Sequence, residues 1–282
     1  MIHMKLKIKD VEFSYNSTPV LDGVCLDLDK PHFTCIIGPN GVGKSTLIHC
    51  INRILKPQGG IVLVDDVDVQ EIKLKEIARR VGYVPQAAKD MFPLTVVDTV
   101  LLGRHPHSGW NTGAADLEVV TELLEQLEID HLSLRSFDEL SAGQRQKVLI
   151  ARGLAQEPEL LLLDEPTSNL DIRHQLEVME LLRDLVRSHN IIILMVSHDL
   201  NITARYADRI IMMKGGKVYA IGTPEEVLTE DNIKTIYGVE AMVVNTNDKP
   251  YVVPLTAVKE SEVGELPSKD AGQKYNDLNI ET

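Results

Sequence analysis

The sequence is poor in cysteine and in long apolar runs. Its three cysteines, Cys25, Cys35 and Cys50, form no CxxC pair and leave an odd number. We therefore expect buried thiols in a reducing compartment, not a disulfide framework. No apolar run approaches the ~20 residues that cross a bilayer, and residues 1–7 lack the apolar stretch of a secretory signal. We expect a soluble chain, so any role at a membrane would come through a partner.

Positive charge is also scarce. The chain has 29 lysine and arginine residues against 42 aspartate and glutamate residues, a net charge of −13. This sign disfavours polyanions, so we expect no nucleic-acid partner and no direct binding to an anionic lipid surface. The 282 residues suffice for about two domains with a sizeable core.

One glycine-rich string matches the pattern GxxxxGKS in full. It consists of Gly38, Pro39, Asn40, Gly41, Val42, Gly43, Lys44 and Ser45. Glycine lets the backbone wrap around phosphate groups, and a helix starting at Lys44 adds its positive dipole end. Residues 33–37 have the pattern of a buried strand and residues 47–51 that of a helix, which is the order this motif requires. We predict that Lys44 reaches the β- and γ-phosphates of a nucleotide and that Ser45 binds magnesium.

Two later apolar runs end in residues suited to phosphate chemistry. Residues 160–163 precede Asp164 and Glu165, and residues 191–196 precede His198. We expect Asp164 to hold magnesium and Glu165 to reach an attacking water. Because parallel strands present their carboxyl ends at one sheet edge, His198 should lie at the same edge.

A string just upstream of the acidic strand narrows the function. Leu140, Ser141, Ala142, Gly143 and Gln144 follow the phosphate loop by about a hundred residues. Many phosphate-loop proteins exist, but few carry an LSAGQ-like string in this place. The combination separates this chain from other nucleotide-binding proteins.

The apolar patterns predict an α/β fold with an inserted helical part. Residues 6–13 and 24–28 alternate apolar and polar side chains, as half-exposed antiparallel strands do. The continuous runs at 160–163 and 191–196 predict strands buried on both faces, with a helix at 172–186 between them. A helical subdomain is expected over residues 89–156, since 115–127 has helical spacing and no strand pattern occurs from 91 to about 135.

The same patterns suggest where domains begin and end. We predict one domain over residues 1–255, in which 1–88 and 157–240 form the core and 241–255 form a hairpin around the turn residues Asn247 and Asp248. Residues 256–282 are polar, and we expect a mobile tail.

Over residues 4–255 the chain resembles the ATP-binding subunit of an ABC transporter. The motifs occur in the order of that family: Tyr15 for adenine stacking, Gly38–Thr46 for Walker A, Gln86 for the Q-loop, Leu140–Gln144 for the signature, Asp164 for Walker B, Glu165 for the catalytic glutamate, Asp171 for the D-loop and His198 for the switch histidine. The resemblance implies a P-loop NTPase (RecA-like) core with an N-terminal antiparallel β-subdomain and an inserted α-helical subdomain.

The resemblance also implies roles for these residues. Catalysis would fall to Glu165, His198, Gln86 and Lys44. ATP would contact Tyr15, Gly38, Pro39, Asn40, Gly41, Val42, Gly43, Lys44, Ser45, Thr46, Ser141, Ala142, Gly143, Gln144 and Asp171. Mg²⁺ would be held by Ser45, Gln86 and Asp164.

One residue departs from the family pattern. Ala142 stands where the usual LSGGQ signature has its first glycine. Alanine keeps the backbone N–H, so the substitution is harmless at negative φ and costs about 1 kcal/mol or more in the left-handed region. We expect negative φ.

The resemblance implies three protein partners. Each nucleotide of the family lies between Walker A of one subunit and the signature of another, so a second copy should pair head to tail around two Mg-ATP. Polytopic transmembrane permease subunits would hold this chain, as a peripheral protein, at the cytoplasmic face of the cell membrane. An extracytoplasmic substrate-binding protein would act indirectly.

Two segments bear on what is transported. Residues 100–107, with the sequence VLLGRHPH, and residues 237–240 resemble importers of ferric siderophores, haem and vitamin B12. Direct metal binding by His105 and His107 is disfavoured because no third ligand is near. The family would place this region against a cytoplasmic helix of the permease.

Other functions stay open at this point. The chain could serve another ABC transporter, including an exporter, although exporters commonly fuse this domain to membrane spans. A soluble ABC protein of translation or DNA repair would usually show two phosphate loops or a long coiled coil. A nonhydrolysing regulatory module would be expected to lack Glu165 or His198, and both are present.

Overall fold

The N-terminal strands form an antiparallel sheet. In the computed structural model of this chain, residues 4–86, 94–109 and 112–258 are described. β1 (Leu6–Tyr15) pairs with β2 (Thr18–Leu28) and with β4 (Gly59–Val64), and β5 (Val67–Asp68) completes the order β2-β1-β4-β5. Buried and exposed side chains alternate along β2, as predicted for a strand with one face in water.

A second, six-stranded sheet carries the phosphate loop. Its order is β10-β9-β3-β8-β7-β6, with every pair parallel except the edge pair β9 and β10. The strands are β3 (Phe33–Ile37), β6 (Val81–Val84), β7 (Leu160–Asp164), β8 (Ile192–Val196), β9 (Arg209–Lys214) and β10 (Lys217–Gly222). Every residue of β3, β7 and β8 is buried, which confirms the prediction made from their continuous apolar runs.

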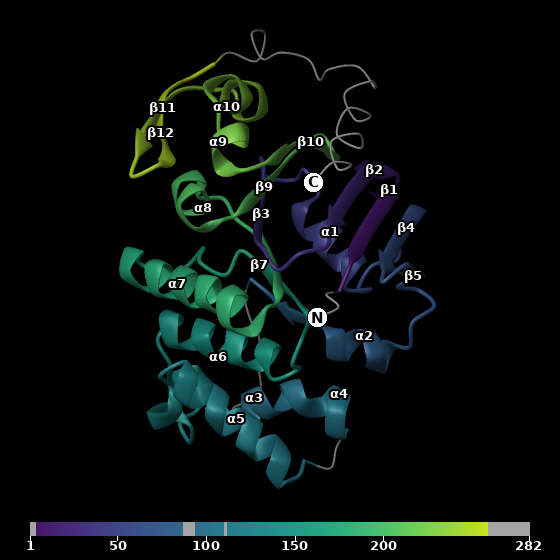
Figure 1. The fold of residues 1–282 in the computed structure, drawn as a ribbon, viewed down its shortest axis with the longest axis vertical. Helices are drawn as coiled ribbons and strands as arrows, with labels where there is room; N and C mark the ends of the chain where they lie inside the picture. The colour runs from purple at the N-terminus through teal and green to yellow at the C-terminus, as the bar shows by residue number, and fades with distance from the viewer. Residues whose placement is uncertain (1–3, 87–93, 110–111, 259–282) are drawn as a thin grey trace.

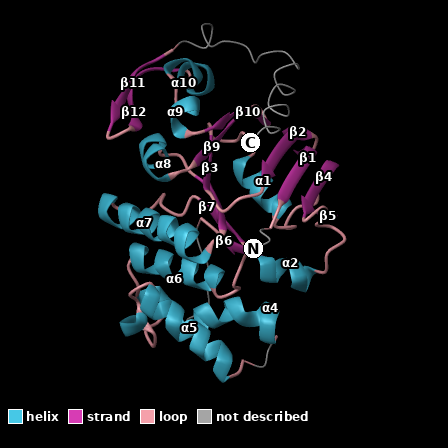
Figure 2. Ribbon diagram, viewed as in Figure 1, coloured by secondary structure: helices cyan, strands magenta, loops and turns pink. Residues whose placement is uncertain are grey.

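Helices cover this sheet on both faces. They are α1 (Lys44–Ile51), α2 (Leu74–Arg80), α7 (Ile172–His189), α8 (Leu200–Tyr206), α9 (Pro224–Val227) and α10 (Glu230–Tyr237). Alternate residues of β7 belong to two separate apolar clusters: Leu161 and Leu163 to one, Leu160 and Leu162 to the other. Figure 2 shows the strands between these helices. The α/β P-loop fold with an added antiparallel sheet is therefore confirmed.

A group of helices lies at one end of the molecule. They are α3 (Val96–Leu101), the 3₁₀ turn η1 (Leu102–Arg104), α4 (His105–Ser108), α5 (Ala114–Gln126) and α6 (Ala142–Leu154), at the bottom of Figure 1. Two further 3₁₀ turns, η2 (Asp130–Leu132) and η3 (Phe137–Glu139), connect α5 to α6. The domain boundaries that we drew around this group stay a prediction, and residues 87–93 lie outside the described part.

A hairpin ends the described chain. β11 (Val239–Thr246) pairs with β12 (Lys249–Ala257), and Asn247 and Asp248 in the turn have φ of 52° and 60°. Two left-handed residues are what a two-residue hairpin turn requires. The hairpin begins before and ends after the predicted bounds of 241–255, and the predicted tail falls almost wholly in residues 259–282, outside the described part.

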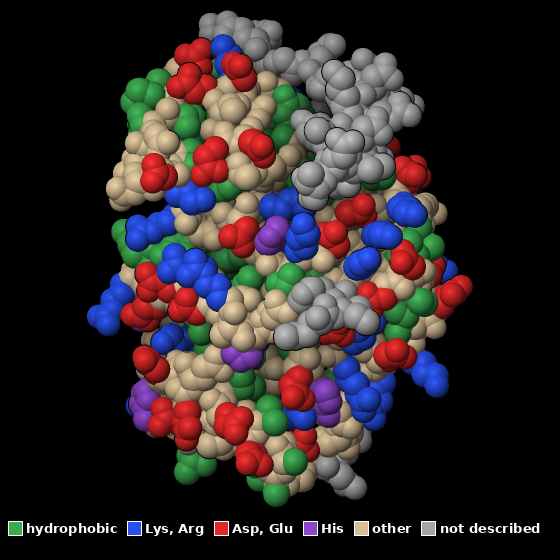
Figure 3. Space-filling view, in the orientation of Figure 1, with side chains coloured by type: hydrophobic (Ala, Val, Ile, Leu, Met, Phe, Trp, Pro, Cys, Tyr) green, Lys and Arg blue, Asp and Glu red, His purple; other side chains and the backbone are tan. Residues whose placement is uncertain are grey.

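The surface fits the composition. On the face shown in Figure 3, acidic and basic side chains are interspersed. None of the helices in the described ranges has both the length and the apolar character needed to cross a bilayer.

Candidate active site

The glycines of the phosphate loop meet two different physical demands. A Cβ on Gly38 would lie 2.5 Å from the carbonyl oxygen of Met213, and one on Gly43 would lie 2.7 Å from the carbonyl oxygen of Val20. Gly41 meets nothing within 4 Å but has a φ of 80°. Gly38 and Gly43 also have positive φ, of 148° and 99°. The loop thus needs glycine for its positive φ at all three positions and for close backbone packing at its ends.

Lys44 begins α1 and is 5% exposed. Its Nζ donates to the carbonyls of Gly38 and Pro39, each at 2.8 Å. Burial lowers the pKa of Lys44, while the nearby carboxylates of Glu165 and Asp164 act to raise it. The ammonium group is therefore held beside the loop backbone and between anionic groups, where it could bind a phosphate.

Ser45 and Asp164 meet across the end of the central sheet. The Ser45 hydroxyl donates to Asp164 Oδ1 at 2.8 Å. Burial raises the pKa of Asp164, which is 7% exposed, and the hydroxyl of Ser45 partly opposes that shift. A hydroxyl and a carboxylate are hard oxygen ligands, and Mg²⁺ bound with a nucleotide takes few protein ligands. The pair thus fits a magnesium ion.

Glu165 sits between two of the other predicted catalytic side chains, Gln86 and His198. Gln86 Nε2 donates to Glu165 Oε2 at 2.6 Å, and His198 Nε2 forms a hydrogen bond with Glu165 Oε1. Glu165 has a φ of 50°, and its N–H donates to the Val196 carbonyl at 3.2 Å. A left-handed residue with a Cβ costs about 1–2 kcal/mol, so this turn holds the carboxylate in place against strain.

The LSAGQ string forms the start of α6. Ser141 is the N-cap: its Oγ accepts from Gln144 N at 3.3 Å, and Gln144 Oε1 accepts from Ser141 N at 3.0 Å. This reciprocal pair is a capping box. Ala142 is the first helical residue and is not among the residues of positive φ. The expectation of an unstrained Ala142 is therefore confirmed.

The two predicted contact residues outside the phosphate loop and the signature lie at the ends of other elements. Asp171 is the N-cap of α7 and accepts from His174 N at 3.0 Å. Tyr15 ends β1 with 46% exposure and packs edge-on against Phe13, with ring centroids 4.9 Å apart. Tyr15 pairs with Thr18 of β2, the strand whose Val20 backs the phosphate loop at Gly43.

Two cavities lie beside Glu165, and neither of them joins the signature to the phosphate loop. A cavity of about 160 Å³ is lined by Gln86, Glu165 and Ala142 but by no residue of the phosphate loop. A larger cavity of about 620 Å³ runs from Glu165 and His198 to Val252 of the hairpin, again without that loop. The structure brings Gln86, Glu165 and His198 together, and Ser45 with Asp164, as predicted.

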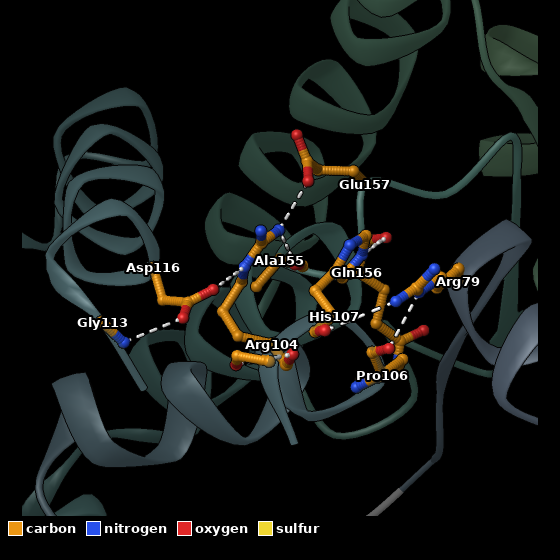
Figure 4. Close-up of polar contacts among 10 residues, drawn as sticks. Arg79, Arg104, Pro106, His107, Gly113, Asp116, Ala155, Gln156 and Glu157 are labelled. Atoms are coloured by element: carbon orange, nitrogen blue, oxygen red, sulfur yellow. Dashed lines mark hydrogen bonds and ion pairs between the residues drawn. The ribbon is translucent and has the colours of Figure 1, made fainter. Parts of the chain in front are cut away.

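Two side chains of the VLLGRHPH string form hydrogen bonds with other segments of this chain. Arg104 is 7% exposed and bonds Asp116 Oδ1 at 3.0 Å, the Ala155 carbonyl at 2.8 Å and Glu157 Oε2 at 2.6 Å. His107 Nε2 bonds the Gln156 carbonyl at 2.8 Å (Figure 4). Arg104 and His107 therefore hold η1 and α4 against the residues that directly follow α6, the helix that begins at the signature.

Arg79 extends this network to the core. Its Nε donates to the Pro106 carbonyl at 2.8 Å, and Nη2 donates to the His107 carbonyl at 3.4 Å (Figure 4). Sequence reasoning missed this bridge between α2 and α4, because the partners are backbone carbonyls about 28 positions away and have no signature in residue type.

Sequence reasoning also missed a pair of side chains near Asp164, one of the predicted magnesium ligands. His49 Nε2 and Tyr83 Oη are 3.0 Å apart, on α1 and β6. Burial raises the pKa of Tyr83 to about 12, with a smaller contribution from Asp164. No local pattern could have joined residues 34 positions apart.

Comparisons with known proteins identify the family to which this chain is similar. A family model described as ABC transporter matches residues 21–168. An uncharacterized ABC transporter ATP-binding protein of Methanocaldococcus jannaschii is 46% identical over 252 residues, which are 89% of this chain and 98% of the relative. The ferric enterobactin transport ATP-binding protein FepC of Escherichia coli is 40% identical over 255 residues, 89% of this chain and 94% of the relative.

A solved structure extends the likeness to three dimensions. It is described as a metal-chelate type ABC transporter in an inward-facing conformation. The TM-score is 0.79 at 30% identity, and the match covers 90% of this chain and 98% of that chain.

Proposed function

This chain belongs to the ABC transporter family and is an ATPase of that family, and we propose that it powers an importer of metal chelates such as ferric siderophores, haem or cobalamin. The observation that carries the proposal is the likeness, over nearly the full chain, to a ferric enterobactin transport subunit and to a metal-chelate transporter. The VLLGRHPH string points the same way.

The geometry of the site supports a role for each catalytic side chain. Glu165 would orient or deprotonate the attacking water, because its carboxylate is held from both sides by Gln86 and His198. Lys44 would exchange its loop carbonyls for the β- and γ-phosphates and stabilise charge there. Tyr15 would stack on adenine.

Magnesium would be held by the oxygen atoms of Ser45, Asp164 and Gln86. The bonded pair of Ser45 and Asp164 supports the first two ligands. When bound, Mg²⁺ would neutralise charge on the phosphate oxygens. Burial of Asp164 favours a cation at this point, since an ionised carboxylate in a desolvated place is stabilised by opposite charge.

ATP would close two copies of the chain head to tail. The signature of each copy, with Ser141, Ala142, Gly143 and Gln144, would then complete the site formed by the other copy's phosphate loop, and Asp171 would lie at the same junction. The start of α6 supports this role, because Ser141 and Ala142 are exposed there and the N-terminus of a helix favours a phosphate group.

A polytopic permease would anchor the chain at the cytoplasmic face of the membrane, and a substrate-binding protein outside would deliver the chelate. Leu74 and Leu102, which are 66% and 47% exposed, lie near the joined α2 and α4 and offer apolar area for such a partner.

Replacing Glu165 tests the assigned chemistry. Glu165→Gln should lower turnover by about 10²- to 10⁴-fold, preserve ATP binding and accumulate an ATP-bound dimer, as measured by phosphate release and sedimentation. Glu118→Gln, on the exposed face of α5, is the matched control and should behave as wild type. A Glu165→Gln chain that stays monomeric at saturating ATP and hydrolyses normally would refute the assignment.

Reconstitution tests the transport role. The tagged chain should co-purify with a protein of many transmembrane helices, and in proteoliposomes with the binding protein its ATPase rate should rise with one chelate class among ferric siderophore, haem and cobalamin. Co-purification with ribosomes or DNA in place of a membrane protein would argue for a different function.

A further inference from the structure

The ring of His174 packs directly on the signature motif. A Cβ built on Gly143 would lie 2.5 Å from His174 Cδ2 and 2.8 Å from its Cγ. Real Cβ atoms do not approach other atoms so closely, and the ring is not the far end of a long flexible side chain. Position 143 therefore requires glycine, because the imidazole of His174 from α7 occupies the space that any other side chain would need.

Asp171 fixes this ring in place. His174 Nδ1 lies 2.9 Å from both Oδ1 and Oδ2 of Asp171, whose Oδ1 also accepts from the His174 N–H. Because a carboxylate only accepts, the proton of the imidazole sits on Nδ1. The two bonds from His174 lower the pKa of Asp171, the backbone bond being the stronger cause. The cap of α7 and the orientation of the ring are thus one arrangement.

The next residue holds the preceding loop. Gln175 Nε2 donates to the Thr167 carbonyl at 3.2 Å, so adjacent side chains at the start of α7 hold the loop that follows Glu165. Figure 1 shows α6 and α7 side by side, and the two helices are in contact. One short segment therefore joins the D-loop, the loop after the catalytic glutamate and the signature.

We propose that His174 is a positioning residue that locks the signature motif to the D-loop of the same subunit, so that the two present themselves to the partner's nucleotide as one rigid surface. The proposal rests on the head-to-tail dimer described above. Its physical basis is that a ring packed on Gly143 and bonded to Asp171 leaves neither motif free to shift alone. A site completed only on closure gains from surfaces that need no further ordering.

The first test distinguishes ATP-driven dimerisation from the binding of ATP to a single chain. In a Glu165→Gln background, His174→Ala should raise the ATP concentration for half-maximal dimerisation by about tenfold, measured by sedimentation. ATP binding to the monomer and the melting temperature should change little, because the phosphate loop and the core are untouched. His189→Ala, at the other end of α7, is the matched control and should leave dimerisation unchanged.

The second test changes both residues of the contact between Gly143 and His174. Gly143→Ala should impair dimerisation because its Cβ collides with the ring, and adding His174→Ala should restore part of the loss. Such a rescue would show that the collision with the ring, and not another effect of the added methyl group, causes the loss. If the double variant closes no better than Gly143→Ala, or if His174→Ala alone has no effect, the proposal is overturned. Failure of the Glu165→Gln chain itself to dimerise would instead overturn the proposed function.

Discussion

At the scale of single residues, Ala142 shows what a departure from a motif can mean. It is the first residue of α6 and has no left-handed backbone, so a glycine gains nothing there. We expect Ala142→Gly to change the ATPase rate by less than about twofold and to lower the free energy of unfolding by up to ~1 kcal/mol. Steady-state phosphate release and urea unfolding measure both quantities.

A strong increase in turnover in Ala142→Gly would contradict this reasoning. It would mean that the closed site needs a backbone angle at position 142 that the present helix start does not have. Equal activity, with the slight loss of stability, would leave alanine as a neutral variation of the signature.

Residue-level prediction from sequence worked where the chemistry is local. Gly38 to Ser45 is one contiguous string, and Asp164 with Glu165 ends one apolar run, so their places could be predicted. The sequence could not show that Gly38 must be glycine because of the Met213 carbonyl, or Gly143 because of His174. Both demands come from elements that meet only in three dimensions.

At the scale of elements, Gly103 controls how η1 approaches α6. A Cβ there would lie 2.2 Å from the Arg152 carbonyl oxygen and 2.9 Å from the Ala155 Cβ. We expect Gly103→Ala to lower the free energy of unfolding by about 1–3 kcal/mol, because neither the backbone of α6 nor the neighbouring chain can give way cheaply. Urea unfolding measures the loss.

Gly113→Ala is the matched control. A Cβ on Gly113 meets nothing within 4 Å and its φ is −105°, so this change should cost no more than about 1 kcal/mol, from the loss of glycine as the N-cap of α5. Equal losses in the two variants would show that glycine flexibility, not contact with α6, explains Gly103.

The Arg104 network gives these helices a pH dependence. The Gly113 N–H and the Arg104 guanidinium lower the pKa of Asp116 from its ordinary 3.8. Ionised Asp116 therefore stabilises the native chain above pH 3.8, and this contribution is lost as the pH falls through the lowered native value. Asp116→Asn should destabilise at neutral pH, and its unfolding curve should approach that of wild type in acid.

Urea unfolding from neutral pH to the onset of acid unfolding provides the measurement. Asp130→Asn, at an exposed position after the same helix, is the matched control and should run parallel to wild type. A constant gap between wild type and Asp116→Asn across the pH range would mean that the carboxylate charge contributes nothing to stability.

Helices and strands with a strong apolar periodicity could be predicted from the sequence, whereas short elements could not. The strands from 160 and from 191 and the helix between them follow from continuous or 3.6-residue apolar patterns. The two residues of β5 and the four of α4 are too short to carry a period. Their form depends on neighbours, as the bonds from Arg79 to α4 illustrate.

At the scale of the whole molecule, one chain offers one phosphate loop and one signature, and neither of the two cavities beside Glu165 joins them. The proposed dimer makes complementation possible. Lys44→Ala removes the phosphate contact of its own chain, and Ser141→Arg blocks the surface that its chain offers to a partner. A dimer of either variant has no intact site, whereas a mixed dimer has one.

Mixing the two variants therefore tests whether the site is shared between chains. In a Glu165→Gln background with two different tags, ATP and magnesium should promote capture of one variant by the other, but not of either variant by itself. Capture that is equal in mixed and unmixed samples would contradict a trans site. A mixture without capture would also contradict a trans site, provided that the chain with unmutated Lys44 and Ser141 still forms dimers. Each site would then need the phosphate loop and the signature of the same chain.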